Sequence, residues 1–219
     1  MSAPPAAEHA PPRVPAARLL TTLGTGGALA GALLVFAYQA TQPTILANKR
    51  KELAQAIAEV LRAPQRYDTL YVYRNALRRE LPPGVDPRGL ERVYLGYGAN
   101  GERIGFAVES NAAGFQDRIG LIFGYESATG RLLGMKVLQS TETPGLGDKI
   151  YKDTAFVGQF SRVAVPLRGV KRGAGRGDSA AVDMITGATI SSRAVIRAIN
   201  DALARLRPLL DGYRAEASR

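Results

Sequence analysis

Residues 182–192 read VDMITGATISS and stand directly before the last helical pattern of the chain. Apolar side chains recur in that pattern every three or four residues, at Ile196, Ile199, Leu203, Leu206 and Leu210. Because this is the spacing of one helix face, we predict a helix over residues 190–210. Gly187 permits a positive φ and Ala188 adds little bulk, so the turn before the helix is small and rigid.

The start of such a helix has two interpretations. Unpaired N–H groups and the positive end of the helix dipole stabilise an anion near Thr189 or Ser191, and the small turn suits a phosphate. Alternatively, Thr189, Ser191 or Ser192 is an ordinary helix cap, which is the commoner role of a hydroxyl before a periodic run. The local sequence leaves both interpretations open.

Upstream of this stretch, the hydrophobic pattern between residues 65 and 140 is typical of strands. Runs rich in β-branched and aromatic residues occupy residues 69–73, 92–97, 103–108, 119–125 and 132–138. Turn sequences separate some of them, at residues 99–101 and 128–130, which predicts an antiparallel sheet built of hairpins. With helices on both sides in the chain, the fold class is α+β: an antiparallel sheet flanked by helices. Glycines inside the runs indicate bulges or the close approach of something flat, at Gly96, Gly105, Gly120 and Gly134.

The N-terminal part predicts one transmembrane helix. Residues 19–40 contain no charge, and at about 1.5 Å per residue such a helix matches a hydrocarbon core of about 30 Å. A cleaved signal peptide is the alternative, but the run is long for one and residues 38–40 form a poor cleavage site. The Pro-rich residues 1–18 predict a disordered tail, and residues 41–64 predict a separate juxtamembrane helix after Pro43.

Composition excludes several kinds of chemistry. The chain has no cysteine and one histidine, His9, which excludes disulfides, thiolate metal sites, cysteine-ligated iron–sulfur clusters and Ser–His or Cys–His catalysis. The net charge is +10, but the basic residues are spread along the chain and only residues 171–176 are locally dense. A solvated basic loop beside a phosphate or a membrane fits this pattern better than a nucleic-acid site, because no nucleic-acid-binding module accompanies it.

Two spaced motifs resemble those of a known family. Residues 183–189 resemble the Asp-x-x-Ser/Thr-Gly-Ala-Thr flavinylation motif of the FMN-binding domain family, in which the last threonine carries FMN through a phosphoester bond. Residues 142–147, ETPGLG, resemble a signature shared by the G subunit of the Rnf complex and the C subunit of sodium-translocating NADH:quinone reductase. The segment Val170–Lys171 is similar to a lysine-containing stretch of the family, and the chain length fits the compact G subunit better.

The resemblance implies a cofactor site but no catalytic residue and no metal ligand of this chain. Thr189 corresponds to the threonine that bears FMN. The other implied positions are Asp183, Thr186, Gly187, Ala188, Glu142, Thr143, Gly145, Leu146 and Lys171. Asp183 assists the transfer of flavin or is only a local turn acceptor, whereas Thr186, Gly187 and Ala188 shape the turn. We expect the flavin ring to lie against residues 142–147, and Lys171 or Arg172 to neutralise the phosphate.

The implied function is electron transfer by covalent FMN. The chain then acts as one electron carrier within an Rnf complex, an oxidoreductase and translocase that couples ferredoxin and NAD redox exchange to sodium or proton movement. The resemblance implies other membrane subunits and a flavin transferase as partners, besides membrane lipid. It also places residues 65–219 on the periplasmic side of the inner membrane behind a single-pass anchor, although counting Arg13 and Arg18 against residues 49–51 slightly favours the opposite orientation.

Two alternatives remain at this point. The first is a membrane-anchored covalent-FMN domain of another extracytosolic reductase or of a regulatory system, which uses the same turn. The second is a basic anchor protein without redox chemistry that binds anionic lipid or a protein partner.

Overall fold

The computed structural model describes residues 15–213 of the 219-residue chain. The chain divides into two compact units, residues 1–50 and 51–219. The predicted disordered tail lies outside the described residues except for residues 15–18, of which the last three already belong to the first helix.

One helix, α1 (Ala16–Val60), takes the place of the two helices predicted for residues 19–40 and 41–64. It runs through Pro43 without a break. In the turn before Pro43, the Thr41 hydroxyl donates to the carbonyl oxygens of Ala37 (2.8 Å) and Tyr38 (3.1 Å). Proline is tolerated inside apolar helices where hydroxyls and local adjustment satisfy the backbone. Within the described residues, α1 is the single helix long and apolar enough to cross a membrane.

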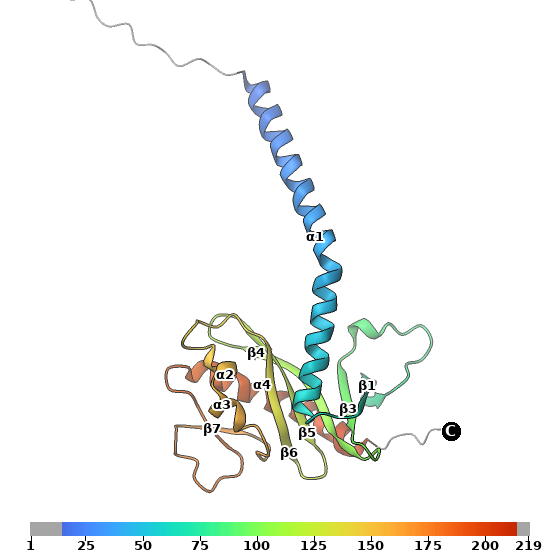
Figure 1. The fold of residues 1–219 in the computed structure, drawn as a ribbon, viewed down its shortest axis with the longest axis vertical. Coiled ribbons are helices and arrows are strands. Elements are labelled where there is room, and N and C mark those ends of the chain that lie inside the picture. Colours follow the sequence, from blue (N-terminus) through green and yellow to red (C-terminus); the bar gives the residue numbers. More distant parts are fainter. Residues whose placement is uncertain (1–14, 214–219) are drawn as a thin grey trace, which may run out of the picture. The chain divides into compact units, whose positions relative to one another are not determined.

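The second unit is built on a six-stranded antiparallel sheet of order β2-β1-β3-β4-β5-β6 (Figure 1). Its strands are β1 (Arg66–Tyr73), β2 (Ala76–Arg78), β3 (Arg92–Tyr97), β4 (Arg103–Ala113), β5 (Arg118–Glu126) and β6 (Arg131–Gln139). The five predicted strands and their antiparallel pairing are confirmed. The short strand β2 was not predicted, because three residues show no period.

Both faces of the sheet are covered. Along β5, Leu121 and Phe123 belong to the larger core beneath the C-terminal helix, whereas Ile122 belongs to a second core against Ile57 and Val60 of α1. Neighbouring strands alternate in the same way, because successive side chains of a strand point to opposite faces. The sheet is therefore packed between helices, which explains why its central strands read as nearly continuous apolar runs.

Glycines let the backbone approach the sheet closely. The ladder shifts register at Gly96/Tyr97 and at Gly120/Leu121, so two of the predicted bulges are present. A Cβ on Gly105 would lie 2.6 Å from the Tyr125 carbonyl oxygen, and one on Gly134 would lie 3.7 Å from the Val60 Cα. What comes close to Gly134 is thus the end of α1, and no flat ligand is needed to explain these glycines.

The remaining elements lead from β6 to the C-terminus. They are α2 (Lys149–Lys152), α3 (Thr154–Gly158), the parallel strand pair β7 (Arg168–Val170) and β8 (Ala181–Asp183), and α4 (Thr189–Gly212). A 3-10 turn, η1 (Pro87–Gly89), precedes β3. The predicted C-terminal helix is confirmed as α4, with its apolar face buried against the sheet.

Candidate functional site

The first turn of α4 is not capped by a side chain. Ala188 occupies the cap position, and no side chain among the described residues accepts a hydrogen bond there. The two buried serines bond elsewhere: the Ser192 hydroxyl donates to the Ala188 carbonyl oxygen (2.9 Å) and accepts from the Ile185 N–H (3.1 Å). The capping interpretation of Thr189, Ser191 and Ser192 is therefore wrong, and the N–H groups of the first turn are left open to an anion.

The turn before α4 presents its residues to solvent. Gly187 has φ +84°, a conformation that side-chain-bearing residues rarely adopt. Thr186 and Gly187 are exposed, Ala188 is buried, and Thr189 is half-buried as the first residue of the helix. Thr189 is thus accessible at a helix N-terminus.

The loop of residues 142–147 lies directly against this turn. A Cβ on Gly187 would be 3.7 Å from the Leu146 side chain, and one on Gly147 would be 3.0 Å from the Ser191 hydroxyl oxygen. The fold therefore brings together the two motifs that the sequence places about forty residues apart. Leu146 itself is 50% exposed.

The loop is closed on itself by Thr143. The Thr143 carbonyl oxygen accepts from the N–H groups of Leu146 (3.2 Å) and Asp148 (3.4 Å), and Gly145 has φ +80°. Asp148 then directly precedes the short helix α2, and the hydrogen bond and charge of Lys152 (2.6 Å) hold the pKa of the Asp148 carboxyl below its usual range. This loop thus keeps a fixed shape, with Leu146 at its outer end.

Glu142 is buried beneath the loop, with only 6% of its surface exposed. Its Oε1 accepts from the backbone N–H groups of Phe115 (2.8 Å) and Gln116 (3.1 Å), and its Oε2 accepts from the Ser191 hydroxyl. Both oxygens of the carboxylate are thus used by protein donors. The sequence motif pointed to Glu142, but it contained no signal for these partners, which come from two distant segments.

The parallel pair β7–β8 brings the basic loop to the same place. Val170 pairs with Asp183, and the Met184 N–H donates to the Val170 carbonyl oxygen (2.9 Å). Parallel strands end at the same edge of a sheet. Lys171, the first residue after β7, therefore lies beside the residues that follow Asp183 and lead into the turn. The Asp183 carboxylate accepts from the Gly173 N–H (3.0 Å), which ties the basic loop to the turn.

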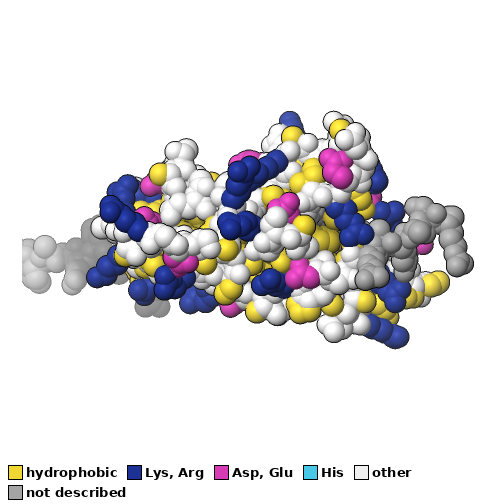
Figure 2. Space-filling view, turned by 90° about the horizontal axis from the view of Figure 1, so that it is seen from below, with side chains coloured by type: hydrophobic (Ala, Val, Ile, Leu, Met, Phe, Trp, Pro, Cys, Tyr) yellow, Lys and Arg dark blue, Asp and Glu magenta, His cyan; other side chains and the backbone are white. Residues whose placement is uncertain are grey.

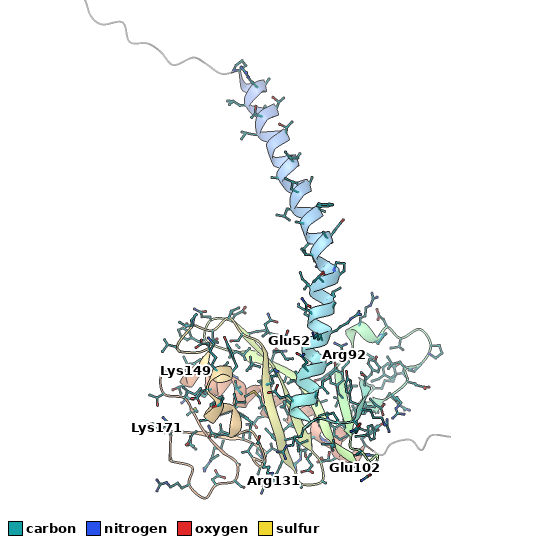
Figure 3. The ribbon with its side chains drawn as sticks, in the orientation of Figure 1. Glu52, Arg92, Glu102, Arg131, Lys149 and Lys171 are labelled. Carbon is teal, nitrogen blue, oxygen red and sulfur yellow. The ribbon has the colours of Figure 1, made fainter. Side chains whose placement is uncertain are left out.

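Charged and apolar side chains surround the start of α4. Lys171 is exposed and forms no ion pair within residues 15–213. Figure 3 labels Lys149 and Lys171 on the same side of the domain. Phe115 and Ile190 are 65% and 51% exposed, and neither was predicted as a site residue. Over the face shown in Figure 2, Lys and Arg side chains are spread among other residues rather than gathered into one stripe.

The described residues contain no group of three or more His, Cys, Asp or Glu side chains suited to a metal ion. The site therefore consists of an open helix N-terminus, an accessible threonine, an exposed leucine and a basic loop. Such a set suits a phosphate group joined to an apolar ring system.

Comparison with known proteins agrees with this geometry. Residues 114–204 match the model of the FMN-binding domain family. This range contains residues 115–116, residues 142–147, the basic residues 171–176 and most of α4.

Curated relatives are similar over most of their length. The chain is 32% identical to the G subunit of the ion-translocating oxidoreductase complex of Methanosarcina acetivorans, over 85% of this chain and 92% of that protein. It is 31% identical to the protein of the same name from Aliivibrio fischeri, over 80% of this chain and 82% of that protein.

Solved structures share the fold. The chain superposes on NqrC of Shewanella oneidensis with a TM-score of 0.61 at 20% identity, covering 70% of this chain and 91% of that one. The C subunit of the Na(+)-translocating NADH-quinone reductase from Parabacteroides distasonis gives a TM-score of 0.60 at 17% identity, covering 77% and 94%.

Proposed function

Because this chain belongs to the family of G subunits of the ion-translocating oxidoreductase complex, and contains an FMN-binding domain, we propose that it is the FMN-carrying electron-transfer subunit of such a complex. The observation that carries the proposal is that three segments meet at the uncapped start of α4. They are the loop of residues 142–147, the basic loop that begins at Lys171, and the turn before Thr189. FMN, when bound, supplies the transfer of one or two electrons, and the protein positions the ring and tunes its potential.

The residues at this site fit a flavin mononucleotide. The uncapped N–H groups of α4 match its phosphate, since an anion at a helix N-terminus is stabilised by both the donors and the helix dipole. The exposed cation of Lys171 adds charge neutralisation. The exposed Leu146 side chain is an apolar surface for the ring, next to the Thr143 and Gly145 positions of the same loop.

We propose that the flavin is attached covalently to Thr189. A separate flavin transferase supplies FMN from FAD: the Thr189 oxygen forms a bond to the flavin-side phosphorus, the bond between the two phosphates breaks, AMP leaves, and the hydroxyl proton is released. The exposed Thr186 and Gly187 leave room for the transferase at this turn. A covalent link keeps the effective concentration of the cofactor high where a dissociated flavin would be diluted.

The setting follows from the same proposal. We place α1 across the inner membrane with lipid around it, and residues 65–219 on the periplasmic side, where tethering is most useful. The partners are then the other membrane subunits of the complex, which donate and accept the electron.

The direct test uses the full chain produced with and without a flavin transferase. We expect flavin fluorescence in the protein band of a denaturing gel only with the transferase, and the mass of one FMN on the peptide that contains Thr189. A protein that stays colourless in the presence of an active transferase, verified on another substrate, contradicts the proposal.

For Asp183 the structure supports the role of anchor for the basic loop. Asp183→Asn keeps an oxygen that accepts from the Gly173 N–H, so we expect flavin attachment within about threefold of wild type, because one neutral hydrogen bond replaces a charged one. Asp183→Ala removes the acceptor, and we expect a loss of about tenfold or more in the attachment rate. The measurement is the time course of gel fluorescence with purified transferase. Equal loss in both variants contradicts the anchor and favours a role of the charge in the transfer itself.

A further inference from the structure

The buried carboxylate of Glu142 joins three segments that are distant in sequence. It belongs to the loop after β6, its Oε1 accepts from Phe115 and Gln116 between β4 and β5, and its Oε2 accepts from Ser191 in α4. We propose that Glu142 is a positioning residue: its hydrogen bonds hold the first turn of α4, and with it the Thr189 hydroxyl, in register with the Leu146 loop. This inference rests on the proposed function of Thr189.

Burial makes these bonds necessary. A carboxylate with 6% of its surface exposed is costly unless donors satisfy it. Here three donors do so, and bonds to a charged acceptor are stronger than those between neutral groups. The first turn of α4 also favours a negative charge nearby through the helix dipole. The carboxylate therefore stays in place and holds the backbone of residues 115–116 and the Ser191 side chain against the loop.

Two glycines lie against the carboxylate at positions where a side chain would not fit. A Cβ on Gly147 would lie 2.6 Å from Oε2 and 3.0 Å from the Ser191 hydroxyl oxygen, and a Cβ on Gly114 would overlap Oε1. The last glycine of the 142–147 loop is thus required by the contact between the loop and α4. The packing of Glu142 and Ser191 thus explains why residue 147 is a glycine, without reference to the flavin.

The link bears on Thr189 through the helix. Ser191 is two residues after Thr189 and lies in the same helical turn. When its hydroxyl is fixed to Glu142, the rotation of the first turn about the α4 axis is fixed too. The same link sets the separation of Leu146 from Gly187, where an added Cβ would lie 3.7 Å from the Leu146 side chain. Loss of the link leaves the core of α4 intact, because the helix is buried further along against β4 and β5.

Hydrogen-bond geometry, rather than charge, is what the proposal requires. A glutamine at position 142 can accept from Phe115 and Gln116 with its oxygen and donate to the Ser191 oxygen with its amide nitrogen. Glu142→Gln therefore restores what Glu142→Ala removes. Ser110 offers a matched control for Ser191, because its hydroxyl donates to the Ala198 carbonyl oxygen (2.8 Å) of the same helix, away from the first turn.

The test compares Glu142→Ala, Glu142→Gln, Ser191→Ala and Ser110→Ala in the full chain. With purified flavin transferase, we expect the attachment rate to fall about tenfold or more in Glu142→Ala, several-fold in Ser191→Ala, and less than about threefold in Glu142→Gln and Ser110→Ala, as lost hydrogen bonds of these kinds imply. Circular dichroism confirms that each variant is folded. Equal effects of Ser191→Ala and Ser110→Ala, or of Glu142→Gln and Glu142→Ala, overturn the proposal.

A second measurement does not depend on flavin. Hydrogen exchange of the amides of residues 115–116, which donate to Glu142, and of the Ser192 amide, which donates to the Ala188 carbonyl oxygen (2.9 Å), should accelerate about tenfold or more in Glu142→Ala but not in Ser110→Ala. If wild-type protein accepts no flavin while this exchange pattern appears, the assignment of Thr189 is lost and the link stands. If flavin attaches normally and exchange is unchanged in Glu142→Ala, the link is wrong and the assignment of Thr189 stands.

Discussion

Thr189→Val is expected to abolish covalent flavin while the domain still folds. Valine has nearly the shape of threonine but no hydroxyl, so the oxygen that forms the phosphoester is missing. Within the described residues, the Thr189 side chain makes no hydrogen bond that stabilises the fold. The substitution should therefore change the free energy of unfolding by less than about 1 kcal/mol. Denaturing-gel fluorescence and intact mass after production with the transferase measure the result.

Thr154→Val is the matched control for this experiment. Thr154 is also the first residue of a helix, α3, and it is exposed on the same domain. The control should keep wild-type fluorescence. A fluorescent band that persists in Thr189→Val contradicts the attachment site, and mass analysis of its peptides then identifies the residue that bears the flavin.

The second large effect concerns stability. A Cβ on Gly124 would overlap the Val60 carbonyl oxygen and lie 3.0 Å from the Leu133 Cβ. Gly124→Ala must therefore push the last turn of α1 away from the sheet, and we expect it to lower the free energy of unfolding by about 1–3 kcal/mol. Chemical denaturation of the full chain in detergent, followed by far-ultraviolet circular dichroism, measures this change.

Gly134→Ala provides the control on the neighbouring strand. Gly134 pairs directly with Gly124, yet its added Cβ would lie at an ordinary contact distance of 3.7 Å from the Val60 Cα. We expect its denaturation midpoint to stay close to that of wild type. If both variants unfold at the same denaturant concentration as wild type, the close packing of α1 on β5 is not important for stability.

The spacing of hydrophobic residues predicted the longer strands and the C-terminal helix, because this spacing depends on the secondary structure of the segment itself. The five longer strands and α4 repeat their period over enough residues to be recognised. The strands β7 and β8 have three residues each, and a parallel pair depends on partners that lie far apart in sequence. The continuous helix α1 was missed because Pro43 is a breaker by local rules, whereas its surroundings decide whether a helix ends.

The candidate site, too, has a part that the sequence motifs predicted and a part that depends on partners distant in sequence. The motifs predicted that Thr189, Leu146 and Lys171 belong to one site, and the fold places their segments together. The contribution of Ser191 was not predicted, since its partner Glu142 is forty-nine residues away and nothing in the local sequence distinguishes it from a capping serine. Backbone donors such as those of Phe115 and Gln116 have no signature in the sequence, because every residue except proline offers an N–H.

The short parallel pair β7–β8 has a consequence for how the chain can vary. Its two strands are joined by the loop of residues 171–180, whose ends are held by strand pairing and by the bond from Gly173 to Asp183. Lengthening a loop costs little in closure entropy, about 0.6 kcal/mol for each doubling. Arg176 and Gly177 are exposed, and a Cβ on Gly177 would meet no atom within 4 Å, so we expect residues inserted beside them to leave the threonine that follows β8 in place.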